Sequence, residues 1–221
     1  MKETNAKNKL IVALIMTVVS VISTICIAVV DVQPIGPQGT YVGIAKVNGL
    51  IASLCPYNEM WYKISKPFLY IALLTLPAAA LVGLIQLIQR KSLKKIDVRL
   101  WISYVYIICL GIIYIVFDKV IVLNYRPVEL NGLEPSFPST HAFLVVSLLL
   151  GTAVVLRGYI KNDNVAKAVI LIAVALSCFT VIARTLSGVH WVTDLIGGVL
   201  YALTVVSFLK YALCRFESEN M

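Results

Sequence analysis

The sequence predicts an all-α membrane protein in which six helices cross the bilayer and both termini are cytoplasmic. Three observations lead to this fold class. Hydrophobic residues make up 60% of the chain and charged residues only 14%, whereas soluble domains are about half apolar and about a quarter charged. Six apolar runs approach the roughly 20 residues that a helix needs to cross the hydrocarbon core. The basic residues are also divided unequally between the loops, as the positive-inside rule requires.

The expected spans form a single membrane domain over residues 1–221, without an internal repeat or low-complexity segment. The first run is too long for an ordinary signal-peptide core and no clear cleavage site follows it, which favours a retained anchor over cleavage near Ala28. The fourth run is short and needs its polar start at Ser139 to complete a span. The six spans are expected at about 10–30, 68–88, 100–117, 139–157, 165–184 and 191–213.

An outer segment over residues 31–66 separates the first two spans. It opens with prolines and glycines between Gln33 and Gly39, which end the helical pattern. Ile44, Val47, Ile51 and Leu54 then recur at helical spacing. This pattern is typical of a helix lying in the membrane interface, and a packing loop is an equal alternative.

Charge distribution sets the expected orientation. With the N-terminus inside, 13 of the 19 lysines and arginines fall on the inner side, which carries a net charge of +8, while the outer side is neutral. The whole net charge of the chain is thus a topology signal. It requires no nucleic-acid partner. The expected location is the plasma membrane.

Polar residues that could take part in catalysis or anion binding gather at the outer ends of spans three to six. Both histidines of the chain belong to this group, together with a carboxylate, three cations and two hydroxyl residues. The candidate site residues are Lys119, Arg126, Ser139, Thr140, His141, Arg184, His190 and Asp194. Singly, a basic residue at a helix end is most often oriented toward the headgroups, so it is their convergence that indicates a site.

The cations predict a phosphate pocket. Lys119, Arg126 and Arg184 can surround one anion, and the arginine fork can bind two phosphate oxygens at once. Ser139 is a plausible N-cap, so the free N–H groups of Thr140 and His141 would point at the same anion from the positive end of a helix.

The two histidines predict a division of catalytic work. His190 and Asp194 are four residues apart, so on a helix they share a face, and a carboxylate on one imidazole nitrogen leaves the other free to attack. His141 can then protonate the leaving oxygen, because the ordinary pKa of a histidine suits this task. No carboxylate cluster suited to Mg²⁺ accompanies them, so we expect a metal-independent site without a cofactor. Five scattered cysteines predict neither a disulfide framework nor a metal site.

These motifs resemble those of the type 2 phosphatidic acid phosphatase superfamily of membrane lipid phosphatases, which carry K-x6-R-P, P-S-G-H and S-R-x5-H-x3-D on a six-helix core. Here they read Lys119–Pro127, Pro138–His141 and Ala183–Asp194. Thr140 replaces the glycine and Ala183 the serine. The resemblance implies that His190 forms a phosphohistidine, Asp194 orients it, His141 is the acid, and the cations with Ser139 bind phosphate.

The expected function is therefore hydrolysis of a phospholipid or polyprenyl phosphate or pyrophosphate at the outer membrane face. Phosphatidate, phosphatidylglycerol phosphate, sugar-lipid phosphates and polyprenyl pyrophosphate all present a terminal phosphate there, and the sequence selects none of them. The oligomeric state is likewise open. The alternatives are a non-catalytic lipid-phosphate binder, a transporter on the same scaffold, or a phosphotransferase with an acceptor other than water. A transporter path would show charges deep in several spans, and binding alone would not require His141, His190 and Asp194.

Overall fold

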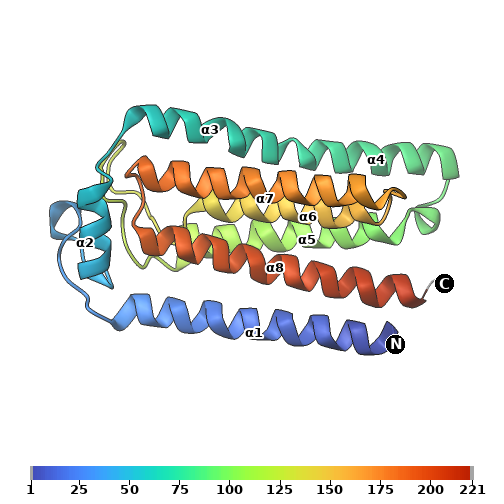
Figure 1. Ribbon diagram of the computed structural model, residues 1–221, viewed down its shortest axis with the longest axis horizontal. Coiled ribbons are helices and arrows are strands. Elements are labelled where there is room, and N and C mark those ends of the chain that lie inside the picture. The colour runs from blue at the N-terminus through green and yellow to red at the C-terminus, as the bar shows by residue number, and fades with distance from the viewer. Residues whose placement is uncertain (1, 220–221) are drawn as a thin grey trace.

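The computed structural model describes residues 2–219 as a bundle of long helices, with two isolated β-bridges and no strand among these residues (Figure 1). Six helical stretches are long and apolar enough to cross a membrane, one of them built from two consecutive helices. The all-α, six-span prediction is therefore confirmed. The helices are α1 (Lys2–Val29), α2 (Ala45–Leu54), α3 (Glu59–Leu73), α4 (Thr75–Arg90), α5 (Val98–Ile115), α6 (Thr140–Arg157), α7 (Asp163–Leu186) and α8 (Val192–Glu219), with 3₁₀ turns η1 (Pro37–Gly39) and η2 (Leu93–Lys95) and a π-helical turn η3 (Val116–Val120).

The second span, Glu59–Arg90, consists of α3 and α4 joined at Leu74. Its first residue lies well before residue 68, where the sequence pattern places the start of the span, because Asn58 caps the helix by accepting a hydrogen bond from the backbone N–H of Trp61. The break precedes Pro77 by three residues. A proline cannot donate a helical hydrogen bond, and its ring crowds the preceding turn, which accounts for the interruption.

Helices α6 and α8 form the centre of the bundle. About half of each span is buried, 50% for α6 and 56% for α8, against 22% or less for the others. Helix α1 runs along α8 (Figure 1), where the hydroxyls of Ser20 and Thr204 lie 2.9 Å apart. The outer helices expose large apolar side chains such as Val12 and Leu171. A surface of this kind matches a lipid environment rather than water.

The ends of the bundle differ in character. Both termini lie at one end, together with η2, whereas α2 and the long connections before α3 and α6 cover the other (Figure 1). Helix α2 lies across the helix ends instead of along them (Figure 1). Its buried Asn48 donates to Thr193 Oγ1 at 2.9 Å and accepts from the Thr193 backbone N–H, which fixes α2 to the first turn of α8. The candidate site residues lie at this end.

Candidate active site

The first turn of α8 holds a fully buried carboxylate, that of Asp194. Its Oδ2 accepts from the backbone N–H of Trp191 at 2.9 Å and from the hydroxyl of Ser136, and its Oδ1 accepts from Asn124 Nδ2 at 3.1 Å. The three donors come from the start of α8 and from two points of the connection between η3 and α6. A buried charge is tolerated only when it is hydrogen-bonded in this way. Asp194 thereby holds the 121–139 connection against α8.

His190 lies beside this carboxylate but does not bond to it directly. Its Nδ1 is 3.7 Å from Asp194 Oδ2, beyond hydrogen-bond range, and 3.1 Å from Ser136 Oγ. Since the Ser136 hydroxyl donates its proton to Asp194, its oxygen is left to accept one from His190 Nδ1–H. This assigns the proton to Nδ1 and leaves a lone pair on Nε2. Ser136 thus bridges Asp194, the expected orienter, and His190, the expected nucleophile. No sequence motif singled out Ser136.

The backbone before His190 is fixed by a close approach of two segments. Gly188 has a positive φ of 65°, and a Cβ there would lie 2.7 Å from the backbone oxygen of Cys55. Glycine meets both requirements without strain. The Asn58 N–H also donates to the Ser187 carbonyl at 3.1 Å. The chain preceding α3 therefore supports the turn that carries His190.

The N-terminus of α6 faces the same region. Ser139 is the N-cap residue and is fully buried, and its backbone N–H donates to the carbonyl of Asp194 at 2.9 Å. Its hydroxyl makes no capping hydrogen bond. Thr140 and His141 form the first turn, at the positive end of the helix dipole. An anion at this end of α6 remains the prediction made from the sequence, and it forms part of the proposed function.

Two arginines complete the buried cluster. Arg184, near the end of α7, is fully buried, donates from Nη1 to Ser65 Oγ at 3.3 Å and lies 5.4 Å from the Tyr62 ring centroid. Arg126 pairs with Glu134, with Nη1 and Oε2 2.9 Å apart.

Both arginines and His141 act electrostatically on His190. Burial, together with the charges of Arg184 and Arg126, holds the pKa of His190 well below its ordinary value near 6.5. His190 is therefore neutral at neutral pH.

Most buried polar atoms without a partner belong to this cluster. Among the described residues, seven buried side-chain nitrogens and oxygens lack a hydrogen bond, and five of them belong to candidate site residues. These five are Arg126 Nε, Ser139 Oγ, Arg184 Nε, Arg184 Nη2 and His190 Nε2. Buried polar groups are normally paired, so such a concentration indicates a binding site. Four of the atoms can donate a proton, and the fifth is the free imidazole nitrogen. The four donors suit the oxygens of an oxyanion, and the free imidazole nitrogen suits an electrophilic central atom.

Lys119 lies outside this cluster. It belongs to η3, its side chain is 75% exposed, and its Nζ is paired with Asp118 Oδ2 at 2.8 Å. The structure brings the seven other predicted residues close together, whereas Lys119, at the same end of the bundle, lies on the surface and is paired with its neighbour. A different lysine, the half-buried Lys66 of α3, acts electrostatically on His141.

Helix α3 also contributes residues that sequence reasoning missed. Tyr62, Ser65 and Lys66 share one face of this helix, because they are spaced three and four residues apart. Tyr62 and Ser65 contact Arg184, and Lys66 Nζ lies 4.2 Å from the Tyr62 ring centroid. The helical spacing of these three residues can be read in the sequence, but only the packing of α3 on α7 shows that they face Arg184. Among the side chains that the structure describes, within residues 4–216, no group of three histidine, cysteine or acidic residues could hold a metal ion.

Comparisons with known proteins place this geometry in context. A family model described as the PAP2 superfamily matches residues 54–216, a range that contains all the candidate site residues. Among solved structures, the chain is similar to the first transmembrane PAP2 type phosphatidylglycerolphosphate phosphatase from Bacillus subtilis. The two share 20% sequence identity with a TM-score of 0.57, over 80% of this chain and 87% of that one. No curated protein sequence matches the chain significantly.

Proposed function

Because the chain belongs to the PAP2 superfamily, we propose that it is a lipid phosphatase in which His190 attacks the terminal phosphate of a lipid phosphate or pyrophosphate. One observation carries the proposal: the unpartnered buried atoms of Arg126, Ser139, Arg184 and His190 combine oxyanion donors with a free imidazole nitrogen. The structural relative is named for phosphatidylglycerolphosphate, and that lipid belongs in the substrate panel beside phosphatidate, a sugar-lipid phosphate and polyprenyl pyrophosphate.

The first chemical step follows from the tautomer of His190. Its Nε2 lone pair attacks phosphorus, the bond from phosphorus to the leaving oxygen breaks, and His141 gives its proton to that oxygen. The lipid alcohol, or lipid monophosphate for a pyrophosphate substrate, departs. Arg126, Arg184, Ser139 and the N–H groups of Thr140 and His141 stabilise the phosphoryl oxygens while charge develops on them. As Nε2 becomes bonded to phosphorus, the imidazole becomes cationic, and Ser136 and Asp194 stabilise this charge through Nδ1–H.

The second step regenerates the enzyme. His141, now neutral, takes a proton from water, the resulting hydroxide attacks phosphorus, and the bond from phosphorus to Nε2 breaks with its electrons returning to the imidazole. Phosphate leaves and His141 is again protonated. Release of phosphate by the purified protein across the substrate panel tests the proposal. No release from any member, with binding retained, would instead identify a non-catalytic lipid-phosphate binder.

The bridging role of Ser136 leads to a separate prediction. In Ser136→Ala, Asp194 loses a donor and His190 loses the acceptor that fixes its tautomer, so activity should fall roughly 10- to 100-fold, as expected for a hydrogen bond to a charged group. The matched control is Ser147→Ala, because Ser147 is equally buried but its hydroxyl has no partner. Steady-state phosphate release by the two variants makes the comparison. Equal activities would contradict a bridging role.

The proposed active site faces the outside of the cell, as the charge distribution indicates. In a chain whose five native cysteines are replaced, an impermeant thiol reagent should label Asn131→Cys in intact cells, because this exposed residue lies at the site end of the bundle. The matched position is Lys94→Cys in η2, at the opposite end, which should react only after lysis. The reverse pattern of labelling would invert the topology.

The proposed chemistry uses groups of the protein and water, without a metal ion. Activity should therefore be unchanged in EDTA and should be inhibited by vanadate, which resembles the five-coordinate phosphoryl transition state. Phosphate release with and without chelator measures this. Complete loss in EDTA, restored by Mg²⁺, would contradict the histidine mechanism.

A further inference from the structure

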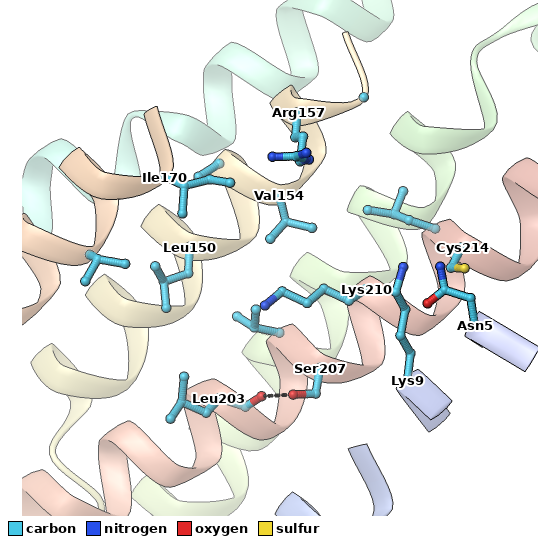
Figure 2. A pocket seen from close by; sticks show the side chains of 15 residues that line it. Asn5, Lys9, Leu150, Val154, Arg157, Ile170, Leu203, Ser207, Lys210 and Cys214 are labelled. Carbon is cyan, nitrogen blue, oxygen red and sulfur yellow. Dashed lines mark hydrogen bonds between the residues drawn. The ribbon is translucent and has the colours of Figure 1, made fainter. Parts of the chain in front are cut away.

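The end of the bundle opposite the candidate active site contains a large pocket between α1, α6, α7 and α8. Its volume is about 790 Å³. Side chains from all four helices line it, and no acidic side chain is among those that the structure describes there. Lys9 comes from α1, Arg157 from α6 and Lys210 from α8 (Figure 2). We propose that this pocket binds an anionic phospholipid of the leaflet opposite the active site.

The pocket changes from cationic to apolar along the helix axes. Leu150 and Arg157 are seven residues apart on α6, as are Leu203 and Lys210 on α8. Seven residues make almost two turns, so each leucine lies on the same helix face as its cation and about 10 Å further along the axis. Figure 2 shows Leu150 and Leu203 on the walls beyond the charged side chains, with Val154 between Arg157 and Lys210. A phospholipid has the same order of charged headgroup and apolar chain.

The cations of the pocket differ in their available charge. Arg157 Nη2 is paired with Asp163 Oδ1 at 3.3 Å, and Lys167 shares this carboxylate. Among the described residues, Lys9 and Lys210 form no ion pair, and Figure 2 shows Lys210 extending from α8 toward α6. Two unpaired ammonium groups and a partly neutralised guanidinium favour one phosphate group. Basic pockets between membrane helices are suited to anionic headgroups for this reason.

The apolar walls identify the occupant as a lipid rather than a soluble anion. Val154, Ile170 and Val174 face the pocket at a depth where the outer helix surfaces are also apolar. Inorganic phosphate could contact the cations but would leave this apolar surface without a partner. An acyl chain would cover it, which adds the hydrophobic contribution of the buried area.

The test uses the purified full chain in a neutral detergent with phosphatidylglycerol, a phosphodiester lipid that offers no terminal phosphate to the proposed active site. Native mass spectrometry measures bound lipid against phosphatidylcholine of the same chain length. We expect selective retention of phosphatidylglycerol. The double variant Lys9→Ala and Lys210→Ala should bind it roughly 10- to 30-fold more weakly, since each basic residue near a membrane surface contributes a factor of several.

Two further variants keep the result interpretable. Lys94→Ala with Lys95→Ala removes the same charge from the same end of the bundle, but on exposed residues of η2 outside the pocket, and should retain the lipid. Ser207→Phe keeps all cations and places a large side chain in the cavity, so this variant should lose the lipid. The substitution breaks no contact between helices, because the Ser207 hydroxyl donates only to the Leu203 carbonyl of its own helix. Equal retention of the two lipids, or equal losses in the two lysine pairs, would overturn the proposal. So would displacement of phosphatidylglycerol by millimolar inorganic phosphate, which would identify a simple anion site.

Discussion

Replacing His190 with alanine is expected to reduce phosphate release by about 10⁴-fold or more, the scale observed when an enzyme loses its nucleophile. The loss should be the same for every substrate, because no other side chain of the cluster offers a free nitrogen at the position of Nε2. The variant should still bind lipid phosphate, since Arg126, Arg184 and Ser139 remain.

The measurement is phosphate release together with acid-labile ³²P incorporation from a labelled substrate. Parent protein quenched during turnover should carry label on a histidine, whereas His190→Ala should carry none. His141→Ala provides the matched control, because it removes the chain's other histidine and leaves the nucleophile in place. Retained labelling in His190→Ala would assign the nucleophile elsewhere. Retained activity would contradict the mechanism as a whole.

Replacing His141 with alanine should have an effect that depends on the leaving group. A general acid contributes about 10² to 10⁴ in rate when the departing oxygen is a poor leaving group, and little when that oxygen is already stable as an anion. His141→Ala should therefore lose roughly this factor on an alkyl phosphate lipid and much less on p-nitrophenyl phosphate.

The decisive quantity is the activity relative to the parent on the two substrates, after size-exclusion chromatography shows that each variant is folded. His190→Ala, measured in parallel, should be inactive on both. Equal losses for His141→Ala on the alkyl and aryl substrates would mean that His141 binds phosphate or supports the fold rather than donating a proton.

The sequence was sufficient to predict the membrane class and six spans because the bilayer imposes a length and polarity that single residues rarely obscure. Span boundaries were less accessible. The second span begins at Glu59 because of the Asn58 cap, and its break at Leu74 reflects Pro77, whereas hydropathy alone reports only the apolar run over 68–88. Such local signals lie in polar or isolated residues that an averaged pattern does not weigh.

The sequence could place candidate residues that lie at or just before a helix start, as with Ser139, His190 and Asp194. The site was less predictable where the direction of a side chain decides which residue it contacts. Lys119 fits its motif by spacing, but its side chain is exposed and paired with Asp118, while Ser136 and Lys66 belong to no recognised spacing. Loop geometry and packing between helices decide these positions, and a linear pattern contains neither.

The carboxylate of Asp194 has a consequence for how the protein acquires its activity. Its desolvation is compensated only when Asn124, Ser136 and the Trp191 N–H are all in place, and these donors reach it from separate parts of the chain. A buried charge that lacks one of its partners costs several kcal/mol, roughly 2 to 5. Arrangements with one donor missing are therefore disfavoured, so we expect the site to form as one cooperative unit. We therefore expect that the carboxylate proposed to orient the nucleophile also makes formation of the site depend on a correctly placed connection between η3 and α6.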